Sequence, residues 1–196
     1  MHVTRPQQRK SSGFSIYRRI GGDAFHKAIE HLEQLQTEFP GLEVRAFEST
    51  RRQPAVQLIN SKEIQHIDAL HELEPAIALG GIFRANPALL ETRHIRFNST
   101  ASTRNHEERY FLLIPSEEDA ALLESMRLAV YKTLAGMVKV DFDIPKRTLD
   151  ATVAYSRRIH PASEKEILDI ISGDLPIDGD LLPAMSTPQP SNNLSL

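Results

Sequence analysis

Polar side chains occupy alternate positions between residues 146 and 156. They are Lys146, Thr148, Asp150, Thr152 and Ser156. Because successive side chains of a β-strand point to opposite faces, a strand here would place all five on one face. A carboxylate can accept a proton and an ammonium group can donate one, so Asp150 and Lys146 form a candidate acid–base pair. That chemistry requires neighbouring groups to tune both pKa values.

A second polar face is expected on the segment around residues 51–57. Arg51, Gln53 and Gln57 share one strand parity, and Val56 and Leu58 share the other. We predict that the two polar faces line one groove. The expected ligand-binding residues are Arg51, Gln53, Gln57, Thr148, Asp150 and Thr152. The alternative is that both faces are simply the solvent faces of antiparallel strands.

Composition excludes several classes of protein. The chain has 196 residues, of which 40% are hydrophobic and 25% charged, as is typical of a globular domain. It contains no cysteine, which excludes disulfides, thiolate zinc sites and a cysteine nucleophile. A formal net charge of -3 argues against a surface that coats nucleic acid, although local basic pairs such as Arg157 and Arg158 remain.

The eight histidines include no pair with the i, i+4 spacing that binds a metal from one helix. We therefore predict neither a metal nor a cofactor. The sequence also has no signal peptide and no apolar run of about 18 residues. A soluble, intracellular protein that does not contact membranes is expected.

Apolar periodicity and turn residues predict an α+β chain in which the order helix, strand, strand, helix occurs twice. The expected strands cover residues 14–20, 42–47, 53–59, 76–83, 92–98, 109–114, 138–144 and 148–156, with a polar loop over 99–107. The expected helices begin with caps at Asp23, Ser61, Ser116 and Ser163. This repeated order predicts two pseudo-symmetric lobes of antiparallel sheet, with outer helices, around a central groove.

The domain boundaries follow from the same pattern. Residues 1–12 are expected to form a flexible arm, and residues 13–174 the two-lobed domain. From Leu175 onward the chain is rich in Pro, Ser, Asn and Asp and lacks periodicity. Residues 175–196 are therefore predicted to be a mobile tail.

Several of these segments resemble the two-histidine (2H) phosphoesterases, which include the LigT-like RNA ligases and cyclic phosphodiesterases. Residues 53–60 and the helix after them resemble the first motif strand, and residues 74–83 resemble the apolar strand with paired glycines. Arg109–Ile114 resembles the start of the second half, and residues 142–156 the second motif. The resemblance covers most of residues 14–172. It implies a groove lined by one His-x-Thr strand from each lobe.

Both motifs depart from the pattern that the family implies. In the family, one histidine is the general base and the other the general acid at a phosphodiester, and the threonines hold the phosphate. Here the first motif aligns as Gln53-Pro54-Ala55, and glutamine cannot act as a general base. The second motif has two registers. Either Lys146 replaces the histidine before Thr148, or residues 150–152 replace His-x-Thr.

The sequence therefore predicts a catalytically degenerate 2H-like protein that binds RNA, a nucleotide or a protein partner through its central groove. One alternative is an active cyclic or 2',5'-phosphodiesterase that uses Asp150 as base with Lys146 or a histidine as acid. The other alternative is a structural or protein-interaction module, because a fold does not guarantee a function.

Overall fold

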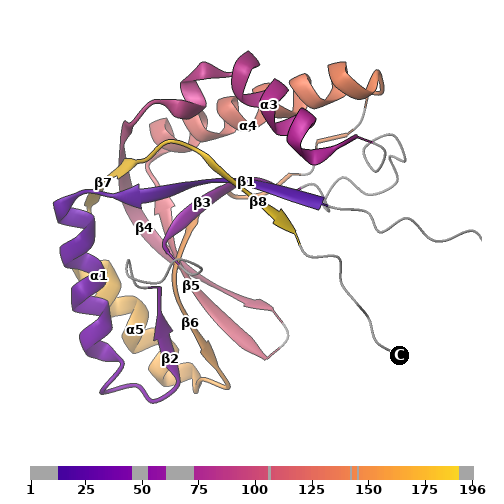
Figure 1. Cartoon of the computed structure of the whole chain (residues 1–196). Helices are drawn as coiled ribbons and strands as arrows, with labels where there is room; N and C mark the ends of the chain where they lie inside the picture. Colours follow the sequence, from indigo (N-terminus) through magenta and orange to yellow (C-terminus); the bar gives the residue numbers. More distant parts are fainter. Residues whose placement is uncertain are drawn as a thin grey trace, which may run out of the picture.

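The computed structural model describes residues 13–45, 53–60, 73–105, 107–141, 143–144 and 146–189. They form a strongly curved antiparallel sheet with α-helices on its outer faces (Figure 1). The predicted α+β class is thereby confirmed. The predicted N-terminal arm and all but the last residue of the helix expected from Ser61 lie outside the described residues.

The helices and strands follow one another along the chain in a mixed order. The strands are β1 (Gly13–Gly21), β2 (Leu42–Val44), β3 (Ala55–Asn60), β4 (Arg93–Asn105), β5 (Glu108–Pro115), β6 (Ala151–Arg157), β7 (Ile177–Leu181) and β8 (Met185–Gln189). The helices are α1 (Asp23–Leu35), α3 (Pro75–Ala85), α4 (Glu117–Val138) and α5 (Pro161–Gly173), with a 3-10 turn η2 (Pro87–Leu90).

The strands are ordered β2-β6-β3-β1-β7-β4-β5, and β8 pairs with β1. Because β5 also pairs with β6, the order returns to β6 and the sheet closes on itself. The contact between β3 and β6 is short. Val56 lies opposite Ala151, and β2 takes the next part of β6, from Ala154 to Ser156. The two strands that were predicted to face each other therefore meet at one paired position.

Apolar stripes on the helices cover the outer faces of this sheet. In Figure 1, α3 and α4 lie above β1 and β3, while α1 and α5 flank the other end of the sheet. The buried stripe of α1 consists of Phe25, Ala28, Ile29, Leu32 and Leu35. The predicted inner face of α4 is buried as expected and consists of Leu123, Met126, Val130 and Leu134. Burial of each of these side chains except Ala28 stabilises the fold by about 1.5–3 kcal/mol relative to exposure.

Arg18 on β1 is fully buried and links β1 to two other segments of the chain. Its guanidinium donates to the carbonyl oxygens of Leu182 at 2.9 Å and Leu181 at 3.0 Å, and also to that of Glu91. Burial lowers the pKa of Arg18, and the nearby charge of Arg93 lowers it further. Arg18 therefore ties β1 to the connection between β7 and β8 and to the segment that precedes β4.

Two predicted strands are wrong. Residues 76–83 form most of α3, because Pro75 at the first helical position favours a helix and Ala78 and Ile82 are buried one turn apart. A short apolar run does not distinguish a buried strand from a buried helix. Residues 138–144 were also predicted as a strand. Instead Val138 ends α4, Lys139 adopts the left-handed conformation, and the described residues that follow are irregular.

The predicted mobile tail is also wrong in its first part. Residues 177–181 and 185–189 form β7 and β8, which pair with β1, and β7 also pairs with β4. The predicted loop over residues 99–107 is mostly the end of a β4–β5 hairpin. These strands escaped prediction because backbone pairing, which composition does not reveal, stabilises polar segments such as residues 177–181.

The helix caps were predicted with mixed success. Ser116 caps α4 as predicted, and its Oγ accepts from the backbone of Asp119 at 3.2 Å. The cap of α1 is Gly22, so Asp23 is the first helical residue. The predicted capping box at Ser163 is wrong, because α5 begins at Pro161 and His160 accepts a hydrogen bond from the backbone of Ala162.

Candidate ligand-binding site

Four polar residues gather where β1, β3 and the segment before β6 approach one another. We call Ser15, Gln57, Arg147 and Asp150 the polar cluster. The Gln57 side-chain nitrogen donates to Ser15 Oγ at 3.3 Å, and Arg147 Nη1 donates to Gln57 Oε1 at 3.1 Å. Burial raises the pKa of Asp150, and the nearby charge of Arg147 partly offsets that increase. The cluster thus joins a guanidinium, an amide, a hydroxyl and a carboxyl group.

The register between β3 and β6 explains why these residues meet. Val56 and Ala151 lie opposite each other and are fully buried. In an antiparallel pair, the next opposing positions are Gln57 with Asp150 and Ala55 with Thr152, and both lie on the other face of the sheet. Ala55, Gln57, Asp150 and Thr152 are only partly buried, in agreement with that assignment. The two polar faces predicted from the sequence therefore lie side by side.

Any antiparallel strand pair has a local two-fold axis, and for β3 and β6 this axis passes through the Val56–Ala151 pair. It exchanges Ala55 with Asp150 and Gln57 with Thr152. If each strand carries one motif of the form His-x-Thr, this symmetry places the motifs at residues 55–57 and 150–152. It thus favours the second of the two registers left open by the sequence, and it moves the first motif two residues beyond Gln53.

The predicted parity of the second strand fails at its end. In the pairing of β5 with β6, Phe111 lies opposite Ala154 while Leu112 lies opposite Thr152, so Val153 is an extra, bulged residue. The bulge turns Ser156 to the face opposite Thr152, and Ser156 is 2% exposed. Ser156 therefore does not belong to the polar face on which the sequence placed it.

The other residues predicted for the site lie outside the polar cluster, and those that the structure describes differ in solvent exposure. Lys146 and Thr148 are exposed and precede β6, outside its paired part. Gln53 is partly buried and lies two residues before the start of β3. Arg51 lies outside the described residues. Of the predicted site residues, Gln57, Asp150 and Thr152 are thus brought together on one face.

Two members of the cluster were missed by reasoning from the sequence. Arg147 was not among the predicted residues. Strand parity would assign it to the other face, but residues 146–149 are not paired as a strand and parity does not apply there. Ser15 lies on β1, whose register with β3 contains a shift between Ile16 and Tyr17. The one signal for Arg147 in the sequence is that it is a basic residue next to the second motif.

The described histidines lie elsewhere. His26 and His31 are on α1, His94 contacts Asp178 at 3.3 Å, and His160 caps α5. Within the described ranges, no group of three or more histidine, aspartate or glutamate residues is arranged to hold a metal ion. The cluster can therefore bind an anion through Arg147 and hydrogen-bond donors, with Asp150 as its one carboxyl group.

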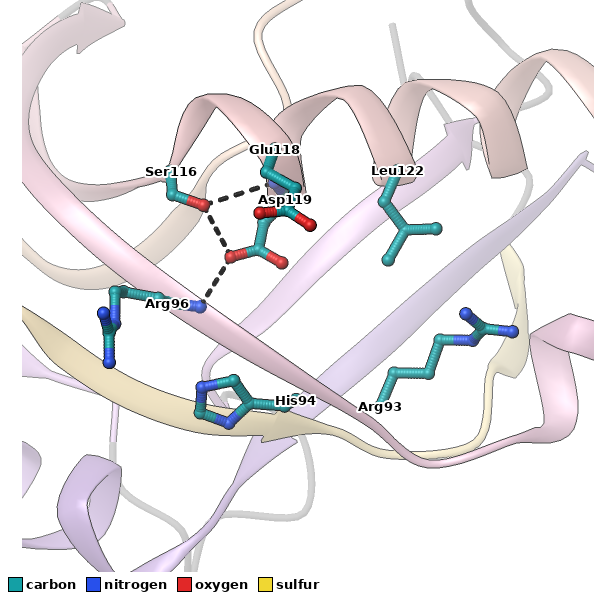
Figure 2. Close-up of a pocket in the computed structure, with 7 residues that line it drawn as sticks. All are labelled: Arg93, His94, Arg96, Ser116, Glu118, Asp119 and Leu122. Carbon is teal, nitrogen blue, oxygen red and sulfur yellow. Dashed lines mark hydrogen bonds between the residues drawn. The ribbon is translucent and has the colours of Figure 1, made fainter.

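A separate cavity of about 540 Å³ lies between β4 and the start of α4 (Figure 2). Its cationic side chains already have acidic partners: Arg96 donates to Asp178 at 2.7 Å, and Asp178 also contacts His94. The hydrogen bond from Arg96 lowers the pKa of Asp178. Asp119 accepts from Ser116 Oγ and from the backbone nitrogen of Arg96, as the dashed lines in Figure 2 show. Internal pairing thus makes this cavity a weaker candidate than the polar cluster.

Helix lengths and compositions also bear on membrane contact. In the part of the chain that the structure describes, no helix is both long and apolar enough to cross a membrane.

No protein-family model matches the sequence, and no curated protein matches it. Solved structures do match the fold. Kluyveromyces marxianus Usb1 with uridine monophosphate is 11% identical, with a TM-score of 0.54 and coverage of 91% of this chain and 94% of Usb1. A second Usb1 structure gives a TM-score of 0.52 at 11% identity and the same coverage. Usb1 has the fold inferred from the sequence motifs, and the chain therefore has the 2H phosphoesterase fold.

Proposed function

We propose that the protein binds a phosphate ester, either an RNA end or a nucleotide, at the polar cluster and does so without histidine chemistry. The observation that carries this proposal is the hydrogen-bonded chain from Arg147 through Gln57 to Ser15, next to the point where the two motif strands meet. Arginine is well suited to phosphate because its planar guanidinium can donate two parallel hydrogen bonds.

The positions of the family's motifs support a binding role rather than the family's usual catalysis. On the two-fold-related positions, Ala55 and Asp150 stand where the 2H motifs carry histidine, and Gln57 and Thr152 stand where they carry threonine. Amide and hydroxyl groups can still donate hydrogen bonds to phosphate oxygens. An alanine cannot transfer a proton. A binding site is thus retained while one of the two proton-transfer groups is lost.

One observation favours a second candidate function, an active phosphodiesterase that uses Asp150. Burial raises the pKa of Asp150, and a carboxyl group with a raised pKa can serve as a general acid or base nearer to neutral pH. Lys146, the partner expected from the sequence, is exposed and precedes β6. This function therefore requires a partner group that moves towards the bound ester.

The test is phosphorus NMR of the purified full chain with 2',3'-cyclic nucleotides and with short 2',5'- and 3',5'-linked oligonucleotides. Binding without turnover should shift or broaden the phosphodiester signals and leave no new monoester signal. Arg147→Ala and Gln57→Ala should abolish the shifts, while Lys132→Ala on the exposed side of α4 should preserve them. The loss of a hydrogen bond from a charged donor, about 1.5–3 kcal/mol, predicts roughly 10- to 150-fold weaker binding for Arg147→Ala.

Two other outcomes are informative. New monoester signals that disappear in Asp150→Asn would establish the phosphodiesterase instead. Unchanged spectra for every ligand, with the protein folded, would refute both functions and leave a structural or protein-interaction role.

A further inference from the structure

The polar cluster continues across the sheet into an apolar surface that no motif predicted. Tyr17 on β1 lies opposite Gln57 on β3, and Met185 on β8 lies opposite Tyr17. Together with Asp150, these residues form a row across neighbouring strands, ordered Asp150, Gln57, Tyr17 and Met185. Opposing residues of paired strands lie on the same face, so the carboxyl, the amide, the aromatic ring and the thioether all face the same side.

Both apolar members of this row are accessible. Met185 is 40% exposed, and Tyr17 is only partly buried. Within the described residues, the Tyr17 hydroxyl has no hydrogen-bond partner. An aromatic ring beside a flexible, polarisable thioether is a surface on which a planar ring stacks well.

We propose that Tyr17 and Met185 form the platform for the nucleobase of the ligand whose phosphate binds at the polar cluster. This inference rests on the proposed function and adds the surface on which the nucleobase binds. Neighbouring strands are about 4.8 Å apart, so Tyr17 lies about 10 Å from Asp150 along the row. A nucleoside monophosphate spans a distance of that order from its phosphate to the far edge of its base.

The position of β8 makes the C-terminal strand part of the site. β8 pairs with residues 13–17 of β1, next to the contact of β1 with β3. Arg18 holds the preceding connection in place through the carbonyl groups of Leu181 and Leu182. The segment that carries Met185 is therefore fixed relative to Gln57, which is what a stacking platform requires.

The ligand class is supported by stacking energetics and by one of the matching structures. Stacking of a base on an aromatic side chain tolerates every base, because each has a flat π-face. The matching Usb1 structure contains uridine monophosphate, so one protein with this fold accommodates a nucleotide. The site is thus assigned to a single nucleotide or to the terminal nucleotide of an RNA.

The test compares the affinities of uridine 5'-monophosphate and ribose 5-phosphate by isothermal titration calorimetry, because the second probe has a hydroxyl group at C1 in place of the base. Stacking predicts that the full chain binds the nucleotide about 5- to 150-fold more tightly. Tyr17→Leu keeps apolar bulk but removes the ring, and it should reduce nucleotide affinity towards that of ribose 5-phosphate. Met185→Ala should cause a smaller loss, and Ile77→Ala on the far side of α3 should cause none.

The outcomes separate this inference from the proposed function. If both probes bind equally, or if Tyr17→Leu weakens both by the same factor, the platform is refuted and phosphate binding stands. If neither probe binds the folded chain, the platform is refuted, and the phosphorus NMR test with phosphodiesters decides whether the proposed function stands. A loss confined to uridine 5'-monophosphate, with ribose 5-phosphate unchanged, supports the platform.

Discussion

Replacement of Arg147 by alanine tests whether the polar cluster exists as described. The interactions lost would include the hydrogen bond from Arg147 to Gln57 at 3.1 Å and the attraction between Arg147 and Asp150. The first does not depend on the ionisation of Asp150, whereas the second requires an ionised carboxylate. The two contributions can therefore be separated by pH.

The magnitudes follow from the partial burial of both side chains. A hydrogen bond from a charged donor contributes about 1.5–3 kcal/mol when buried, and partial exposure of Arg147 reduces this to about 1 kcal/mol. A partly exposed ion pair adds about 1 kcal/mol at most. We expect Arg147→Ala to lower the free energy of unfolding by about 1 kcal/mol near pH 4 and by about 2 kcal/mol near pH 7.

The sign of this pH dependence follows from the pKa of Asp150. Because burial raises that pKa above the unfolded value, the native state loses stability as the pH rises through the folded pKa. Below the unfolded pKa both states are protonated, and the penalty is absent. Removal of Arg147 raises the folded pKa further, so the additional loss appears only above the ordinary carboxyl range.

Urea unfolding of the full chain and of Arg147→Ala at both pH values measures these differences. Lys146→Ala, one residue away but exposed, is the matched control and should change stability by less than about 0.5 kcal/mol. Asp150→Asn should remove the pH-dependent part of the Arg147→Ala effect. An equal loss at both pH values would refute the interaction with Asp150, and no loss at either would refute the cluster itself.

Three further predictions concern the scaffold. Gly80→Ala on α3 should raise stability by about 1 kcal/mol, because nothing lies within 4 Å of the added methyl group. Gly81→Ala should be less stabilising, because its methyl group would collide with Met137 Cε. Thermal unfolding of the two variants measures the difference. Ser116→Ala removes the cap of α4 and should cost about 1 kcal/mol in urea unfolding, with Ser116→Asp retaining most of the stability. Arg18→Ala leaves three carbonyl oxygens without their donor and should destabilise by more than about 3 kcal/mol, seen as a large drop in the urea midpoint; a change below about 1 kcal/mol would contradict the role given to Arg18.

The sequence-based predictions succeed where an element has a clear local pattern and fail where it depends on its context. Local periodicity identified α1 and α4 because each helix buries one apolar stripe against the sheet. The residues of such a stripe recur at helical spacing in the sequence. Residues 76–83 form a nearly continuous apolar run without a clear helical period, and such a run is compatible with a strand or a helix. Pro75 at the first helical position favours the helix. β7 and β8 have polar or mixed sequences, and backbone pairing with β1 stabilises both strands.

The sequence alone determined the fold class, the principal helices and the two polar strand segments, because hydrophobic period and residue chemistry are local properties. It also predicted that Gln57, Asp150 and Thr152 lie on facing polar strands, and the structure places them on one face. Only the tertiary structure decided which residues face one another. The single pairing of Val56 with Ala151 sets the register, the bulge at Val153 turns Ser156 away, and β1 and β8 bring Tyr17 and Met185 into line with Gln57. Register depends on long-range backbone pairing, and a shift of one residue exchanges every side chain between the two faces of a strand.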